Sequence, residues 1–280
     1  LGCDALRTIS PRLVYMAISG FGTEGPLRRA PAYDPIIQAH SGMAATQGGD
    51  DSPAFIRSLL CDKITAYTAC QAVTSALFAR ERSGEGQLID LSMLDSGLFF
   101  MFPDGFQNHA LLDKDAIPGG MLIDILYDLT LTKDGGITVA AANQEMQGRM
   151  LKAIGLLYLL GDERFSTMQK LVENLHIFRG VVAEKCLEYT SDELLALLRE
   201  VEVPCAKCLS RDEVLAQEQV SANDSIAEVD HPHLGTLRVV KAPPRFGGER
   251  LEPSRPVPAH GEHTDAVLAD FGLDSQRINT

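Results

Sequence analysis

In the first 93 residues, apolar runs and helical periodicities follow one another in the order strand, loop, helix, strand. Residues 12–18 are rich in Val, Ile and Tyr behind a proline, which predicts a buried strand. Residues 33–45 predict a helix. In residues 63–82 the apolar side chains recur at spacings of four, three and four, the period of one helix face. Residues 87–93 predict the next strand. This order favours an α/β layer with a mostly parallel sheet.

A second unit is expected after residue 120. Its predicted strands flank a turn that begins at Lys133-Asp-Gly-Gly, and helices follow them. Ser191 and Ser210 have the sequence context of helix N-caps, and Thr264 is expected to cap a last helix that ends at Gly272. The further expected elements are strands 122–131, 136–142 and 235–240, helices 143–154, 163–171 and 191–200, and a proline-rich extended segment, 243–258.

The chain is strongly acidic, which excludes some partners. It has 280 residues, 45% of them hydrophobic, and a formal net charge of −13. Such a charge is unsuited to nucleic acid or to an anionic membrane surface. No apolar run approaches the roughly 18 residues of a membrane helix, and the first residues lack a signal-peptide pattern. We therefore expect a cytoplasmic protein that binds neither nucleic acid nor membrane.

The cysteines indicate neither a disulfide framework nor a metal site. Six cysteines in a chain of this length are too few for a disulfide scaffold. Cys205-Ala-Lys-Cys208 forms a C-x-x-C pair, but the histidines that could complete a zinc site do not have the spacing of a known zinc module. We predict no metal.

A glycine motif follows the first predicted strand. Gly20, Gly22 and Gly25 form a G-x-G-x-x-G pattern, which in dinucleotide-binding folds leads directly into a helix. Here Pro26 and Pro31 follow and would break that helix. The pattern therefore predicts a tight loop that exposes its backbone, and not a nicotinamide or flavin site.

Asp62 is the most interesting carboxylate in the chain. It stands where an apolar run meets the start of the helix predicted over residues 63–82, at the expected N-cap. The helix dipole favours a negative charge there, and a carboxylate can act as a covalent nucleophile. An N-cap aspartate is also common for purely structural reasons, so the pattern alone leaves both roles open.

Several ordered segments resemble the class III coenzyme A transferases, the family of formyl-CoA and carnitine CoA-transferases. The resemblance runs from residue 1 to about residue 275. It rests on Ile18-Ser-Gly-Phe-Gly-Thr-Glu-Gly-Pro26, Ala32-Tyr-Asp-Pro-Ile-Ile-Gln-Ala39, Ser41-Gly42, Glu81-Arg-Ser-Gly-Glu-Gly-Gln87, Asp90-Leu-Ser-Met-Leu-Asp95 and Gly261-Glu-His-Thr-Asp-Ala-Val267.

The resemblance implies roles for particular residues. Asp62 takes the position of the family's nucleophile, and Tyr33 and Asp34 lie near the acyl group. Met93 lies beside the coenzyme, with Gly20 and Gly22 in the loop that contacts it. The implied reaction moves coenzyme A from an acyl-CoA donor to a carboxylic acid acceptor, through an aspartyl-acyl anhydride and an aspartyl-CoA thioester.

The resemblance also implies an architecture. The expected fold is α/β, with a Rossmann-like large domain, an inserted smaller α+β domain and an interlocked homodimer. Residues 1–93 are then the large-domain core, 94–120 a linker, 121–225 the small domain and 226–280 a return segment with the C-terminal helix.

Two departures from the family pattern leave alternatives open. Family members carry a further segment ahead of residue 1 that contributes to coenzyme binding, so a truncated, non-catalytic chain is one alternative. No glycine run like the lid of formyl-CoA transferase follows residue 94. An α-methylacyl-CoA racemase is the other alternative, but its Gly-His-Asp segment is replaced here by Ala32-Tyr33-Asp34.

Overall fold

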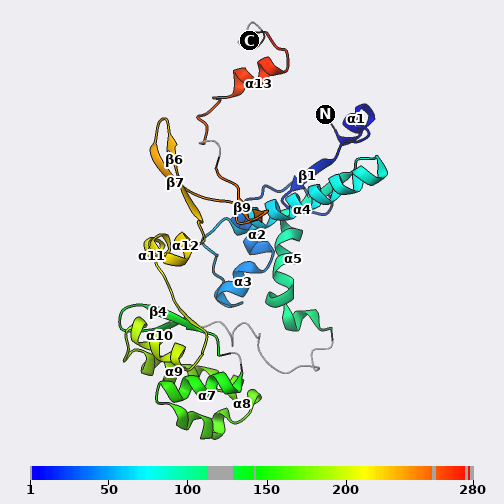
Figure 1. The fold of residues 1–280 in the computed structure, drawn as a ribbon. Helices are drawn as coiled ribbons and strands as arrows, with labels where there is room; N and C mark the ends of the chain where they lie inside the picture. The colour runs from blue at the N-terminus through cyan, green and yellow to red at the C-terminus, as the bar shows by residue number, and fades with distance from the viewer. Residues whose placement is uncertain (1, 113–128, 142, 254–256, 275–276, 278–280) are drawn as a thin grey trace. The chain divides into compact units, whose positions relative to one another are not determined.

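The computed structural model describes every residue except 1, 113–128, 142, 254–256, 275–276 and 278–280. The fold is mixed α/β, and its contacts divide the chain into two compact units, Leu1–Lys207 and Cys208–Thr280 (Figure 1). The first unit contains two separate hydrophobic clusters, one before residue 113 and one after residue 128.

Two parallel strands organise the first part of the chain. β1 (Tyr15–Ser19) pairs with β2 (Leu88–Ser92), with Tyr15 opposite Leu88 and Ser19 opposite Ser92. This pairing confirms the predicted parallel connection and places the carboxyl ends of both strands side by side. The helices of this part are α1 (Cys3–Ile9), α2 (Asp34–His40), α3 (Met43–Gly48), α4 (Leu60–Ser83) and α5 (Met93–Gly105), followed by a 3-10 turn, η1 (Gln107–Ala110).

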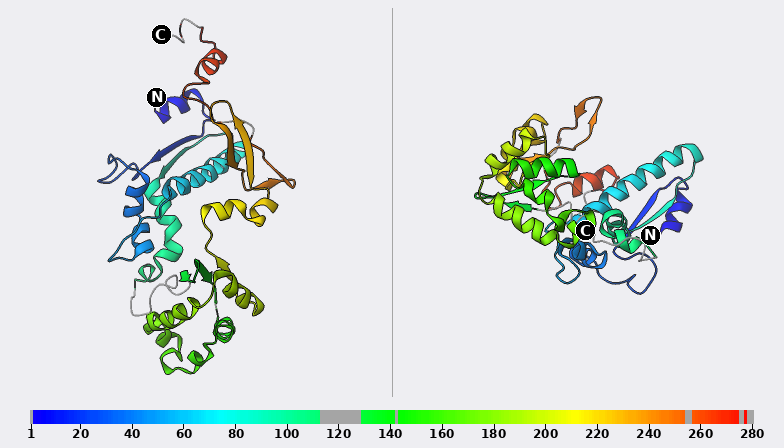
Figure 2. Two further views of the ribbon diagram at one scale, coloured as in Figure 1. Left: turned by 90° about the vertical axis from the view of Figure 1, so that its left-hand side faces the viewer. Right: turned by 90° about the horizontal axis from the view of Figure 1, so that it is seen from below.

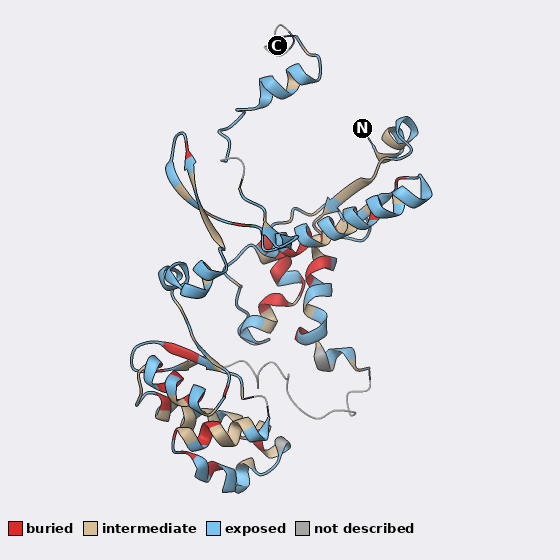
Figure 3. Cartoon of the chain, viewed as in Figure 1, coloured by how far each residue is buried: buried red, intermediate tan, exposed pale blue. Residues whose placement is uncertain are grey.

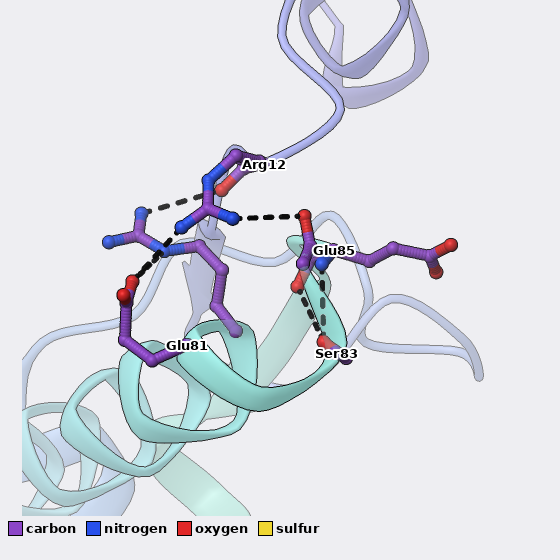
Figure 4. A network of polar contacts seen from close by, with 6 residues as sticks. Arg12, Glu81, Ser83 and Glu85 are labelled. Atoms are coloured by element: carbon purple, nitrogen blue, oxygen red, sulfur yellow. Dashed lines mark hydrogen bonds and ion pairs between the residues drawn. The ribbon is translucent and has the colours of Figure 1, made fainter.

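The C-terminal end of α4 is joined to the segment that precedes β1. The Arg12 guanidinium forms an ion pair with Glu81 (3.1 Å) and donates to the carbonyl oxygen of Gly84, while Ser83 closes a turn with Glu85 (Figure 4). Gly84 has φ +79°, the left-handed conformation that ends many helices. These contacts fix where β2 begins.

Helices α2 to α5 share one small core. Ile37, Met43, Cys61 and Ile64 form its buried centre, and α4 and α5 both contact β2. Figures 1 and 2 show α4 beside the two strands, and Figure 3 shows buried residues where α2 to α5 meet. A side chain at Gly97 of α5 would come within 3.2 Å of Ser41 and 3.7 Å of the Cys61 sulfur. The glycine therefore lets α5 approach the start of α4.

The second part of the first unit packs helices against a small antiparallel sheet of order β3-β4-β5. The larger of the two clusters, centred on Ile137, Leu151 and Leu194, lies within it. Its strands are β3 (Leu129–Leu131), β4 (Gly136–Val139) and β5 (Cys205–Lys207), and its helical elements are α7 (Gln144–Ala153), η2 (Leu157–Gly161), η3 (Glu163–Phe165), α8 (Met168–Glu173), α9 (Leu175–Cys186) and α10 (Ser191–Glu200).

In the second unit, Cys208–Thr280, the described residues form two hairpins and three short helices. Lys241 is buried at the base of the β6–β7 hairpin and donates to Asp224 (2.8 Å) and Glu252 (2.7 Å). These two ion pairs tie the hairpin to the chain on both sides of it. The elements are α11 (Arg211–Ala216), α12 (Glu218–Ala222), β6 (Ile226–His231), β7 (Gly235–Val240), β8 (Arg245–Phe246), β9 (Glu249–Arg250) and α13 (Thr264–Asp270).

Several predicted boundaries are wrong, each for a local reason. The helix expected over 33–45 is two helices, because Gly42 adopts φ +80° between them. α4 begins at Leu60, so Asp62 is its third residue and not its N-cap. Thr190 and His263 are the N-caps of α10 and α13, one residue before the predicted Ser191 and Thr264.

Other predictions missed or misplaced whole elements. The helix expected over 163–171 is a 3-10 turn followed by α8, because Thr167 caps a new helix. The strand β6 and the helix α9 were not predicted; α9 contains Gly180 and β-branched residues, which are weak helix formers. Residues 122–128 of one predicted strand lie outside the described residues. The domain boundaries implied by the resemblance remain predictions.

Within the parts of the chain that the structure describes, no helix is long and apolar enough to cross a membrane.

Candidate active site

Asp62 lies in the first turn of the longest helix that the structure describes. α4 has 24 residues, and Asp62 is its third, next to the fully buried Cys61. The Asp62 side chain is exposed. It therefore presents a carboxylate to solvent at the end of the helix where the dipole favours a negative charge.

The first turn of α4 is capped from another helix. Leu59, at the N-cap position, offers no side-chain acceptor. Instead the Asp62 backbone N–H donates to Oδ2 of Asp34, at 3.0 Å, and Asp34 is the first residue of α2. This bond satisfies one of the N–H groups that a helix start leaves unpaired. The two predicted site residues are thus in direct contact, through the Asp34 carboxylate and the backbone N–H of Asp62.

Asp34 is buried, and both of its oxygens accept hydrogen bonds. It is 2% exposed, and Oδ1 accepts from Nε2 of Gln38 at 2.6 Å. Gln38 also bonds the backbone of Ile56 and Ser58, in the loop that leads into α4. Asp34 and Gln38 together join α2 to the chain on both sides of residue 60.

Cys61 is an unsuitable nucleophile in this arrangement. Burial, together with the neighbouring carboxylates of Asp34 and Asp62, raises the pKa of its thiol to about 11. The thiol is therefore protonated near neutral pH, and its sulfur packs in the core shared by α2, α4 and α5. The position agrees with the interpretation of Cys61 as a small buried hydrophobic residue.

The glycine loop begins where β1 ends and is shaped by its glycines. Gly22 has φ +98°, its N–H donates to Oγ of Ser19 at 3.0 Å, and the carbonyl oxygen of Gly20 accepts from the N–H of Leu94. A Cβ on Gly20 would lie 2.2 Å from that of Ala32. No helix follows before Tyr33, which confirms the predicted tight loop.

A pocket of about 290 Å³ lies at the carboxyl ends of the two parallel strands, the edge where open α/β sheets commonly bind ligands. At its floor, Ser92 is the N-cap of α5 and exchanges hydrogen bonds with Asp95. The lining residues are Ser19, Phe21, Gly22, Thr23, Glu24, Asp90, Leu91, Ser92 and Asp95. With three carboxylates in its lining, this pocket suits a neutral or cationic group better than a phosphate.

The structure brings most predicted site residues to one region. Met93 starts α5 and packs against the core that contains Cys61, and Phe21 of the pocket lining packs against the same core. Tyr33, the N-cap of α2, differs from these residues because its ring is 75% exposed. Among the described residues, no three or more His, Cys, Asp or Glu side chains gather as metal ligands.

Sequence reasoning missed Gln38. Its signal was present, because Gln38 lies four residues after Asp34 on a predicted helix and therefore on the same face. The sequence could not indicate that the Gln38 amide would bond the backbone of the loop of residues 56–58.

The strand pair, the glycine loop and the helix start define an α/β protein with a solvent-facing carboxylate near a strand-end pocket. Comparison of the sequence with known protein families identifies the family within that class. The profile of CoA-transferase family III matches residues 1–264, and the chain belongs to this family.

Proteins similar to this chain include CoA-transferases. The chain is 28% identical over 282 residues to an acyl-CoA transferase of Fusarium pseudograminearum, covering 99% of this chain and 62% of that protein. It is 28% identical over 274 residues to a succinate–glutarate CoA-transferase of Agrobacterium fabrum, covering 97% of this chain and 68% of that protein. The chain therefore spans less than two thirds of the Fusarium protein.

A solved structure shares the fold. The crystal structure of a CAIB/BAIF family protein from Brucella suis superposes with a TM-score of 0.78 at 27% identity, over 97% of this chain and 71% of that one.

Proposed function

We propose that this chain transfers coenzyme A between an acyl-CoA donor and a carboxylic acid acceptor, with Asp62 as the covalent nucleophile. The observation that carries the proposal is the exposed Asp62 carboxylate in the first turn of α4, with its backbone held by Asp34. Membership of CoA-transferase family III and the names of the relatives support the reaction class.

In the proposed first half-reaction, an Asp62 carboxylate oxygen attacks the thioester carbonyl of the donor and expels coenzyme A as a thiolate. The product is a mixed anhydride between Asp62 and the donor acyl group. The thiolate then attacks the aspartyl carbonyl, forming an aspartyl-CoA thioester and releasing the donor acid as a carboxylate.

The second half-reaction repeats these steps with the acceptor. Its carboxylate attacks the aspartyl carbonyl and expels the thiolate, which gives a second mixed anhydride. The thiolate then attacks the acceptor's acyl carbonyl, so that a new acyl-CoA leaves and the Asp62 carboxylate is restored. No proton, metal or redox agent is consumed.

The remaining site residues are assigned within this proposal. The loop that contains Gly20 and Gly22 contacts the coenzyme together with Met93, and backbone amides of this loop other than that of Gly22, which donates to Ser19, can stabilise oxyanions. Tyr33 contacts the acyl group with its exposed ring. Asp34, placed in the acyl site by the family resemblance, is also positioned to hold the backbone of Asp62.

A Rossmann-like large domain and a homodimer are part of the proposal. Support for a partner copy comes from large apolar side chains that α4 and α5 expose, including Tyr67, Phe78 and Phe99, the last 83% exposed. Large apolar side chains exposed on two neighbouring helices are a feature of many interaction sites. The cytoplasmic location stays a prediction from the sequence.

The proposal is tested by trapping the covalent intermediate. The protein is incubated with succinyl-CoA and glutarate as probes, quenched with hydroxylamine and digested with trypsin, which releases the peptide of residues 58–63. We expect an aspartyl hydroxamate on that peptide. Asp62→Asn should abolish the adduct and lower transfer on the order of a thousandfold or more.

A matched control distinguishes the nucleophile from a helix-start aspartate. Asp192 is also exposed in the first turn of a helix, α10, and Asp192→Asn should leave trapping unchanged. Full transfer by Asp62→Asn would overturn the proposal. Loss of label from the α-carbon of a 2-methylacyl-CoA without transfer would indicate a racemase instead.

A further inference from the structure

We propose that Gln38 is a positioning residue for the Asp62 nucleophile, acting through Asp34 and through the loop that leads into α4. This inference rests on the proposed function. Gln38 makes no hydrogen bond to the reacting carboxylate of Asp62; it bonds Asp34 and the backbone of the loop that leads into α4. Its effect on the reaction is exerted through the backbone on both sides of residue 60.

The Gln38 amide is buried and fully used. The residue is 2% exposed, Oε1 accepts from the N–H of Ile56 at 3.0 Å, and Nε2 lies 3.1 Å from the carbonyl oxygens of both Ile56 and Ser58. Nε2 also donates to Oδ1 of Asp34 at 2.6 Å. A buried polar group with this many partners is expensive to disturb, because each lost bond leaves another buried group unsatisfied.

The partners allow only one orientation of the amide. If it were flipped, the oxygen would face the Asp34 carboxylate and the NH₂ would face the N–H of Ile56, two repulsive pairings. Gln38 therefore also fixes the Asp34 carboxylate, whose other oxygen accepts from the Asp62 N–H. One side chain thus determines both the path into α4 and the cap on residue 62.

A positional error at Asp62 is costly for the chemistry. The reacting carboxylate is one side chain beyond the backbone that this network holds, and a shift of about 1 Å in a reacting group can lower a rate about a hundredfold. A change at Gln38 should therefore slow acylation of Asp62 more than it raises the Michaelis constant for acyl-CoA, since Gln38 itself is not among the predicted substrate contacts.

Gln38→Glu makes the hydrogen bond between residues 38 and 34 dependent on pH. The new carboxyl keeps the shape of the amide and meets Asp34 at the same short distance, so the pair is stable only while it shares a proton. At pH 5 the protonated Glu donates to Asp34 and accepts from Ile56, as Gln38 does, but it loses the contacts that Nε2 makes with the carbonyl oxygens of Ile56 and Ser58. At pH 8 the shared proton is lost and the two carboxylates repel.

Several titratable or charged groups lie on the elements packed against α2. α4 carries Cys61, Asp62 and Lys63 in its first turn and Tyr67, Cys70, Arg80, Glu81 and Arg82 farther along, α5 carries Asp95 and Asp104, and the loop that Gln38 bonds carries Arg57; the described α3 has none. His40 lies on α2 itself, stacked edge-on against Phe21. The parent protein, which carries all of these groups, supplies the reference rate at each pH.

The experiment measures the rate of hydroxamate formation on the 58–63 peptide with succinyl-CoA at pH 5 and pH 8, each relative to the parent. We expect Gln38→Glu to be about a hundredfold slower than the parent at pH 8 and clearly less impaired at pH 5, where the shared proton restores the bond to Asp34. Gln38→Met, which cannot be rescued by a proton, should be slow at both. Near-UV circular dichroism establishes that each variant is folded.

Gln169→Glu is the matched control. Gln169 also donates to a carboxylate four residues away, Glu173 at 2.9 Å, but on an exposed face of α8. Its rate should equal that of the parent at both pH values. Amide exchange of residues 57–64 gives a second readout without catalysis, and relative to the parent at the same pH it should accelerate more in Gln38→Glu at pH 8 than at pH 5.

The outcomes separate the two proposals. One outcome would overturn the role of Gln38 alone: the parent is trapped at Asp62, and Gln38→Glu has the same trapping rate relative to the parent, and the same amide exchange relative to the parent, at both pH values. Absence of any adduct on Asp62 in the parent would overturn the proposed function and, with it, this inference.

Discussion

Replacing Gly86 with alanine should be one of the most destabilising small substitutions in the chain. Gly86 is buried where the backbone after α4 crosses the segment that leads into β1. A Cβ built on it would lie 2.0 Å from the carbonyl oxygen of Leu13 and 2.4 Å from its carbonyl carbon. Both are backbone atoms, so no side-chain rotation can relieve the overlap.

The magnitude follows from what must separate. The added methyl group is roughly 1.4 Å short of the 3.4 Å at which ordinary contact begins. Moving the two segments apart strains the Gly86 N–H bond to Pro11 and the Tyr15 N–H bond to Gln87, both 2.9 Å. Two bonds at about 1 kcal/mol each, with about 1–3 kcal/mol for overpacking, give a loss of roughly 3–5 kcal/mol.

The assay is urea unfolding followed by far-UV circular dichroism at one fixed protein concentration. Gly180→Ala is the control, because Gly180 lies exposed in α9 with no atom near the position of its missing Cβ. There the same methyl group should stabilise the helix by about 0.5–1 kcal/mol. A Gly86→Ala midpoint equal to that of the parent would refute the close approach of the two segments.

Two further predictions concern the core and the assembly. The thiol pKa of Cys61 is raised to about 11, so roughly one part in a thousand of it is thiolate at pH 8. In a short iodoacetamide pulse we expect Cys61 to react far more slowly than the exposed Cys70 and Cys208, with a rate that rises toward pH 11. Equal labelling of the three cysteines by peptide mass spectrometry would contradict the burial of Cys61. The exposed aromatic side chains of α4 and α5 predict a homodimer in light scattering at micromolar concentration, and a stable monomer would count against it.

Local signals were sufficient to predict much of the fold. The period of apolar residues predicted α4 to within three residues at its start and one at its end, and Ser210 with Glu213 forms the expected capping box. The strand pair is parallel as the order of elements predicted. In each case the evidence lay within one element or in the order of neighbouring ones.

The start of α4 could not be predicted, because its cap comes from another helix. Leu59 offers no capping side chain, and the sequence pattern pointed to Asp62 as the cap, which led to the boundary error of three residues. The true acceptor, Asp34, is 28 residues away in sequence. Similarly, the role of Gln38 depends on a loop whose path only the tertiary structure defines.

The cap on α4 links the order of folding to the appearance of the nucleophile. The helix can grow from its middle, but its first turn gains the acceptor for the Asp62 N–H only after α2 has docked. A nascent or partly unfolded chain therefore carries Asp62 on a frayed end without a fixed direction. The group that would react with a thioester therefore gains its fixed backbone only in a chain in which α2, the entry loop and α4 are together.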